Sequence, residues 1–249
     1  KKAFSTLSAL KTLNLSTNFI SDFQDCFVGL QNLVTLDLEE NEITFLPQNV
    51  FNHLKSLQFL NLGSNYIAHL TTNTFQQIPL KVLYLGNNNI TEIDNGTFNE
   101  LLNLETLNIS YNSLESFDVN LLKHLQNLKR LFIGSNNLNQ LDGMLLVQTI
   151  PKLQLININD NEIPCEDLPH LLTVFKTHGL DYVSVEKGVL GNFDGVSCVE
   201  TESAAVINIM NYKRILKNTN QKLETVKEYL QKINSTSQSM LEERSNAMQ

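Results

Sequence analysis

The chain has 249 residues, of which 42% are hydrophobic, and a formal net charge of −8. Such a negative charge argues against a duplex nucleic-acid binder that depends on phosphate contacts, and against a protein that adheres to anionic membranes. The sequence contains no apolar run long enough to cross a membrane and does not start with a signal peptide, so we expect a mature or trimmed product.

An apolar pattern closed by an asparagine recurs from Leu10 to Ile163. Its clearest copy, residues 57–67, reads L-x-x-L-x-L-x-x-N-x-I. Seven copies occur, and their asparagines are Asn18, Asn41, Asn65, Asn88, Asn112, Asn136 and Asn161. This string is the signature of a leucine-rich repeat. The sequence therefore predicts an α/β fold, a leucine-rich-repeat solenoid that occupies residues 1–163.

Each part of the repeat has a physical reason. The L-x-L piece alternates with period two, which predicts a short strand with leucines inward and the x positions outward. Strands one repeat apart are expected to stack into a parallel sheet, which forms the concave face of the solenoid. The asparagine amide has both donors and acceptors, so a column of asparagines can satisfy turn backbone groups from repeat to repeat.

A second apolar column follows the asparagines and is expected to fill the convex half of the core. Its members are Phe4, Phe27, Phe51, Phe75 and Phe98, continued by the smaller Leu122 and Val147. No cysteine-bearing cap precedes Phe4, although the end of a solenoid core must be covered. We expect that further repeats have been removed there; cover by a partner is the alternative.

The repeat pattern stops after Ile163. Apolar residues from Leu168 to Phe175 recur at helical spacing, Gly179 is expected to end that helix, and residues 180–185 alternate like one more strand. Residues 164–202 resemble the C-terminal cysteine cap of extracellular leucine-rich-repeat proteins in a shortened form. This resemblance implies a bridge between Cys165 and Cys198. Cys26 is then left over, as a half-buried free thiol or as one end of a bridge to another segment or chain.

Residues 203–249 change to a composition rich in Lys, Glu, Gln and Asn, with apolar residues in heptads. The predicted seam consists of Ile209, Tyr212, Leu216, Thr219, Leu223, Val226, Leu230 and Ile233. A narrow seam normally packs against another helix, so we expect a coiled coil with a second chain. The alternative is a helix that folds back on its own solenoid.

Five N-x-S/T sequons make the protein a candidate glycoprotein. They begin at Asn14, Asn89, Asn95, Asn108 and Asn234. Asn89 and Asn95 fall in turns, which suit a glycan. Asn14 and Asn108 point from predicted strands onto the concave face, where a glycan would block part of the surface.

The sequence favours a binding protein over an enzyme. It contains no nucleophile elbow, zinc-protease motif, phosphate-binding loop or dinucleotide fingerprint, and its five histidines are scattered. We therefore predict no catalytic residue, metal or cofactor. The candidate binding residues are outward positions of the predicted strands: Thr35, Asp37, Glu39, Phe59, Asn61, Tyr84, Thr106, Arg130, Phe132 and Asn157. The three aromatic residues have no core role there, which fits a protein-binding patch; alternatively they only cover the sheet.

The order of repeats, cysteine cap and coiled coil resembles the secreted leucine-rich-repeat immune proteins of mosquitoes. That resemblance implies a secreted protein of innate immunity that dimerises through its helix and holds a complement-like protein. The repeats alone also resemble Toll-like receptor ectodomains, which implies a ligand-binding receptor fragment instead. An enzyme is the third and weakest alternative.

Overall fold

A computed structural model describes residues 3–22, 25–184 and 191–201, and every structural statement below concerns these residues. The chain divides into two compact units, Lys1–Val199 and Glu200–Gln249. The predicted seam from Ile209 to Ile233 and the sequon at Asn234 lie outside the described residues, so the coiled coil stays a prediction. Among the described helices, none combines the length and apolar character that a bilayer crossing requires.

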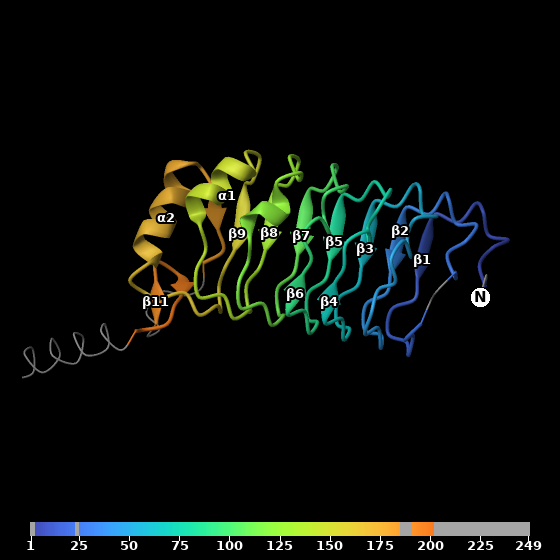
Figure 1. Cartoon of the computed structure of the whole chain (residues 1–249), viewed down its shortest axis with the longest axis horizontal. Coiled ribbons are helices and arrows are strands. Elements are labelled where there is room, and N and C mark those ends of the chain that lie inside the picture. The colour runs from blue at the N-terminus through green and yellow to red at the C-terminus, as the bar shows by residue number, and fades with distance from the viewer. Residues whose placement is uncertain (1–2, 23–24, 185–190, 202–249) are drawn as a thin grey trace, which may run out of the picture. The chain divides into compact units, whose positions relative to one another are not determined.

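One parallel sheet runs through the first unit. Its strands are β1 (Thr12–Asn14), β2 (Thr35–Asp37), β3 (Phe59–Asn61), β5 (Val82–Tyr84), β7 (Thr106–Asn108), β8 (Arg130–Phe132), β9 (Leu155–Asn157) and β10 (Asp181–Tyr182). They pair in that order, each with its sequence neighbour in the sheet, and stand side by side in Figure 1. Equivalent residues of successive repeats face each other, for example Leu60 with Leu83 and Leu83 with Leu107. The predicted parallel solenoid sheet is confirmed.

The repeat asparagines form the expected column of hydrogen bonds. Asn112 Nδ2 donates to the carbonyl oxygens of Leu85, Ile109 and Ser110 at 3.0–3.1 Å, and its Oδ1 accepts from the Ile90 N–H at 2.9 Å. The same pattern of three donated bonds and one accepted bond recurs at the buried Asn41, Asn65, Asn88, Asn136 and Asn161. Each asparagine thus joins two repeats through backbone groups of the turns that follow the strands.

The side of the core opposite the sheet changes along the chain. Phe27, Phe51, Phe75 and Phe98 are fully buried and stack with ring centroids 6.0–6.3 Å apart. Beyond them the side is closed by the 3₁₀ helix η1 (Val119–Leu122) and the helix α1 (Gly143–Thr149).

Leu122 continues the phenylalanine column, but the extension to Val147 is wrong. Leu146 is fully buried in α1, whereas Val147 is half-buried. Asp142 caps α1 by accepting from the Leu145 N–H at 2.8 Å. Leu146 is 24 residues after Leu122 and Val147 is 25 residues after it, so the repeat length of 23–25 residues allows both. The helix places Leu146, and not Val147, on its buried side.

The segment after the repeats packs on the end of the sheet beside α1 (Figure 1). The predicted helix is α2 (Leu168–Thr177), and Gly179 follows it at φ +68°. Residues 181–182 then join the sheet as β10, parallel to β9. The buried Gly143 of α1 faces this helix: a Cβ placed there would lie 2.4 Å from Leu171 Cδ1, so a side chain at this position would have to displace Leu171.

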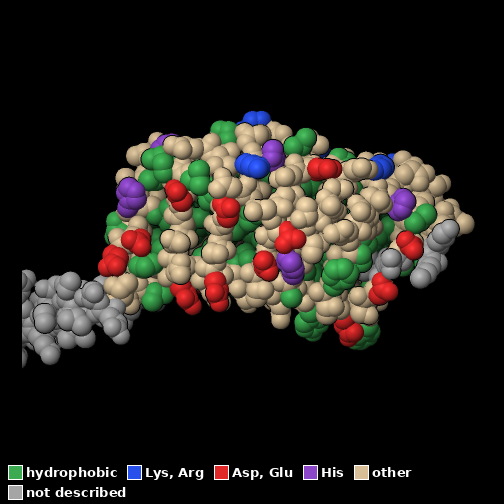
Figure 2. Space-filling view, viewed as in Figure 1, with side chains coloured by type: hydrophobic (Ala, Val, Ile, Leu, Met, Phe, Trp, Pro, Cys, Tyr) green, Lys and Arg blue, Asp and Glu red, His purple; other side chains and the backbone are tan. Residues whose placement is uncertain are grey.

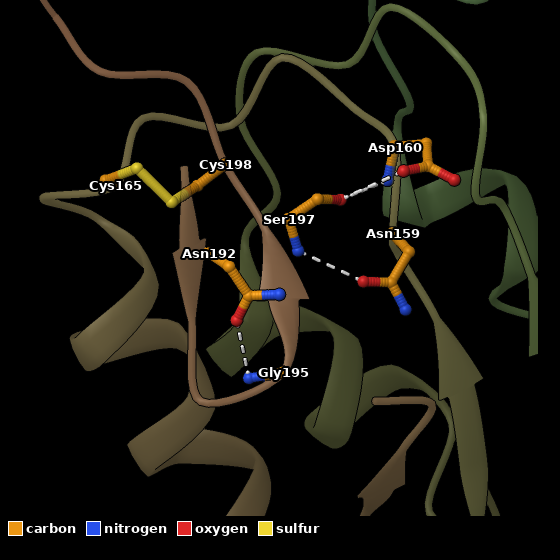
Figure 3. The surroundings of a disulfide bond; sticks show 7 residues. All are labelled: Asn159, Asp160, Cys165, Asn192, Gly195, Ser197 and Cys198. Atoms are coloured by element: carbon orange, nitrogen blue, oxygen red, sulfur yellow. Dashed lines mark hydrogen bonds between the residues drawn. A yellow bond between two sulfur atoms is a disulfide. The ribbon is translucent and has the colours of Figure 1, made fainter. Parts of the chain in front are cut away.

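A small hairpin completes the unit. It consists of β11 (Asn192–Phe193) and β12 (Val196–Ser197), and the structure joins Cys198 just after it to Cys165 (Figure 3). The Ser197 N–H donates to Asn159 Oδ1 at 3.1 Å, which ties the hairpin to the last repeat. Cys26 is a free thiol, half-buried against the core.

Candidate binding surface

The outward residues of strands β1, β2, β3, β5, β7, β8 and β9, with the second residue after each strand, form one continuous surface, which we call the ladder face. Because the strands are parallel and in register, their outward residues form rows across the sheet. One row runs through Thr35, Phe59, Val82, Thr106 and Arg130, and the next through Asp37, Asn61, Tyr84, Asn108, Phe132 and Asn157. All ten predicted binding residues lie on this face.

Several of these residues have a structural role that the sequence analysis missed. The side chains of Asp37, Asn61 and Asn157 each accept a hydrogen bond from the backbone N–H two residues later, at 2.9–3.1 Å. Asn14 and Asn108 do the same at 2.8 and 2.9 Å. One side-chain oxygen of each of these residues is thus used to hold the backbone after the strand. An Asn or Asp at the last strand position was the available signal.

Two predicted binding residues are buried. Thr106 is 3% exposed because Arg130 lies over it, with Arg130 Nε donating to Thr106 Oγ1 at 3.1 Å. Asn61 is 7% exposed, and its Nδ2 donates to Glu39 Oε2 at 3.1 Å. The expectation that every outward position is available to a partner is therefore wrong for Thr106 and Asn61. At these two positions a partner would meet the side chain of Arg130 in place of Thr106 and that of Glu39 in place of Asn61.

The aromatic residues are the largest features of the ladder face. Phe59 on β3 and Tyr84 on β5 meet edge to face, with centroids 5.5 Å apart and an interplanar angle of 83°. Tyr84 and Phe132 flank Asn108 in one row, so the strand spacing of about 4.8 Å places their backbones about 10 Å apart. All three aromatic residues are half-buried, with the rest of each side chain open to solvent.

Charges surround this aromatic group with a different sign at each end. Asp37 and Glu39 lie on the side of β2, while Arg130 lies on β8. Lys129 and Glu105, the residues directly before β8 and β7, neutralise each other. Lys129 Nζ contacts Glu105 Oε2 at 2.8 Å, and this hydrogen bond holds the pKa of the Glu105 carboxyl below its usual value. The ladder face thus offers an apolar centre with an acidic end and a basic end.

The described sequons fall on two surfaces. Asn14 and Asn108 lie in β1 and β7 of the ladder face, as expected, and Asn108 stands between Tyr84 and Phe132. Asn89 and Asn95 are exposed outside the sheet, Asn89 in a loop and Asn95 in a turn.

A cluster that the sequence analysis did not find lies away from the ladder face. The short parallel strands β4 (His69–Leu70) and β6 (Glu92–Ile93) pair along one edge of the molecule. His69 Nε2 lies 2.9 Å from Asp94 Oδ1, and this contact, with the Thr72 N–H, keeps the pKa of Asp94 below its usual value. Residues 23–25 positions apart meet here only because the repeats stack.

Comparisons with known proteins agree with the repeat architecture. The family model described as "Leucine rich repeat" matches residues 1–42, 31–80 and 78–138, more than half of the chain. A solved leucine-rich-repeat protein of Leptospira interrogans matches with a TM-score of 0.65 and 29% sequence identity over 73% of this chain. The match covers 45% of that protein's chain, so this chain spans less than half of its length. The curated proteins gave no match.

Members of this family are generally protein-interaction modules without enzymatic activity, which agrees with the ladder face described above. The resemblances to mosquito immune proteins and to Toll-like receptors stay predictions from the sequence. With seven repeats in register, a parallel sheet, an asparagine column and a matching family model over most of the repeats, the chain belongs to the leucine-rich-repeat family.

Proposed function

We propose that this chain binds a protein partner through the ladder face, with Phe59, Tyr84 and Phe132 as the apolar anchors. The observation that carries the proposal is that these three large aromatic side chains stay partly open to solvent while the strand leucines fill the core. Aromatic residues dominate protein–protein contacts because each buries a large area at a small entropic cost.

The surroundings of the aromatic group support a protein partner of mixed charge. Arg130 of β8 covers Thr106 beside the aromatic residues. Asp37 and Glu39 lie on the other side of the aromatic residues, at β2. An apolar centre with a polar rim is the usual arrangement of a protein interface. We expect a partner that presents an apolar side chain between a basic group and an acidic group.

The proposal constrains glycosylation. A glycan on Asn108 would stand between Tyr84 and Phe132 and exclude a partner from the aromatic group. We therefore expect Asn108 to be unmodified in the active protein and Asn89 and Asn95 to be the occupied sites. Peptide mass spectrometry of the native protein checks this, and full occupancy of Asn108 would contradict the proposal.

We further propose an extracellular location, supported by the Cys165–Cys198 bond and by exposed sequons. An innate immune role with pairing through residues 203–249 is the finer form of the proposal. Its support is the order of repeats, cysteine-bearing segment and heptads. A ligand-binding ectodomain fragment of a receptor is the alternative form.

The test compares two pairs of substitutions in the full chain. Tyr84→Ala with Phe132→Ala removes anchors from the ladder face, while Phe19→Ala with Tyr66→Ala removes aromatic residues that are 87% and 58% exposed elsewhere. Each chain is used to capture proteins from native extracellular fluid, and captured proteins are quantified by mass spectrometry. Equal thermal unfolding of the three chains is the control for folding.

We expect a defined set of proteins to be captured by the wild type and by the Phe19/Tyr66 pair. The Tyr84/Phe132 pair should bind each of them at least about tenfold more weakly, since a hot-spot residue contributes about 2 kcal/mol or more. Equal capture by all three chains would place the binding site elsewhere.

A further inference from the structure

The edge cluster on β4 and β6 has the composition of a transition-metal site. His69 and Glu92 are direct cross-strand partners in the register of these two strands. Asp94 lies two residues after Glu92, so its side chain projects on the same side of the ladder as Glu92. One atom each from His69, Glu92 and Asp94 lies within 4.8 Å of the other two.

The backbone holds this arrangement in place. The Asp94 N–H donates to the Leu70 carbonyl oxygen at 2.9 Å, which extends the β4–β6 pairing. Asp94 Oδ2 accepts from the Thr72 N–H at 3.2 Å, so Oδ1 is left to face His69. Orientation of a ligand carboxylate by a second hydrogen bond is a regular feature of protein metal sites.

A histidine–aspartate ion pair alone leaves negative charge uncompensated. A hollow of about 400 Å³ next to the cluster is lined by Glu92, Asp94 and Asp118, and no lysine or arginine is among its lining residues. Figure 2 shows acidic side chains and a histidine over the lower edge, where Figure 1 places β4 and β6, while the Lys and Arg side chains of this view lie along the upper edge. Three carboxylates thus line this hollow without a lysine or arginine, an arrangement that favours a cation of higher charge.

We propose that His69 Nε2 and the carboxylates of Glu92 and Asp94 bind one divalent transition-metal ion, with Zn²⁺ as the best fit, on the edge formed by β4 and β6. Imidazole with two carboxylates suits Zn²⁺, whereas Ca²⁺ and Mg²⁺ take oxygen ligands. Ligands about 2.1 Å from a tetrahedral ion lie about 3.4 Å from one another. The 2.9 Å contact between His69 and Asp94 therefore opens slightly, and the exposed Glu92 side chain moves in. Water completes the coordination.

The site belongs to one pair of repeats. The positions equivalent to His69 and Glu92 in the flanking repeats are Phe45 and Ser116, which bring no comparable ligand set. Metal binding would therefore link the repeat that contains His69 to the next repeat. None of the three ladder-face anchors belongs to β4 or β6. The inference does not depend on the proposed function, because the anchors Phe59, Tyr84 and Phe132 are not part of it.

The test measures Zn²⁺ binding by the full chain without an affinity tag, by titration calorimetry with Zn²⁺ alone. Wild type is compared with His69→Gln, Glu92→Gln and the matched control His124→Gln, which changes an exposed histidine outside the cluster. We expect one Zn²⁺ per chain, at least about tenfold weaker binding in the first two variants, and unchanged binding in the control. Excess Mg²⁺ should not compete.

Thermal unfolding is the second measurement. Zn²⁺ should raise the unfolding temperature of the wild type and of His124→Gln, but not of His69→Gln, because a ligand stabilises the state that binds it. Without Zn²⁺ the four chains should unfold alike. Absence of one-to-one binding, or equal binding by all four chains, would overturn the assignment and leave His69 and Asp94 as an ion pair only.

Discussion

The two halves of the described repeats share one sheet but close the opposite side of the core in different ways. Between Phe27 and Phe98 that side consists of turns over a stack of phenylalanine rings. From Val119 onward η1, α1 and α2 take over, with Leu122, Leu146 and Phe175 buried beneath them.

The difference shows which part of a repeat is free to vary. Strand and asparagine positions must keep their spacing, because each backbone group meets a partner in the next repeat. The opposite side has only to fill its volume at normal packing density, and rings or helices do this equally well. Substitutions on the sheet side should therefore cost hydrogen bonds between repeats, whereas substitutions on the opposite side should cost packing.

The largest effect is expected from Phe75→Ala. Phe75 lies between Phe51 and Phe98, at 6.1 and 6.3 Å between ring centroids, and its loss leaves a cavity in the stack. We expect the free energy of unfolding to fall by about 3–5 kcal/mol. Chemical denaturation measures it. The control is Val147→Ala in the helical half, where a half-buried valine should cost about 1 kcal/mol or less. An equal cost at Val147 would mean that the column does extend through it.

A smaller loss is expected from Asn112→Ala. The substitution removes four hydrogen bonds that join two repeats and takes the acceptor from the buried Ile90 N–H. The three carbonyl oxygens each keep a second donor. We expect a loss of about 2–4 kcal/mol in the free energy of unfolding. Asn18→Ala is the matched control, because Asn18 is exposed and donates only to Leu15 and Ser16 of its own repeat. Similar losses in both variants would argue against the asparagine column as a link between repeats.

The smallest effect is expected from Tyr111→Asn, and it is a gain. Seven equivalent residues directly before the repeat asparagines have positive φ: Thr17, Glu40, Ser64, Asn87, Tyr111, Ser135 and Asp160. Asparagine tolerates this left-handed conformation better than tyrosine does, so the exposed Tyr111 is a site of strain. We expect a stabilisation of about 0.5 kcal/mol in thermal unfolding. The reverse change, Asn87→Tyr, should destabilise by a similar amount, and a gain there would refute the explanation.

The sequence by itself determined the repeat, its strands, the asparagine column and the helix from Leu168. These features follow from spacing alone, because a strand has period two, a helix has period 3.6, and stacked repeats bring equal positions together. The outward position of Phe59, Tyr84 and Phe132 followed from the same period. No contact between neighbouring repeats is needed to predict these features.

The tertiary structure decided what depends on contacts across repeats. Thr106 is buried because Arg130 of the next strand covers it, and the side of α1 that faces the core holds Leu146, while Val147 stays half-buried. His69, Glu92 and Asp94 meet because two edge strands pair 23 residues apart. A repeat pattern states which positions are equivalent, but not which contacts the side chains of neighbouring repeats make. Those contacts determine burial, exposure and the edge cluster.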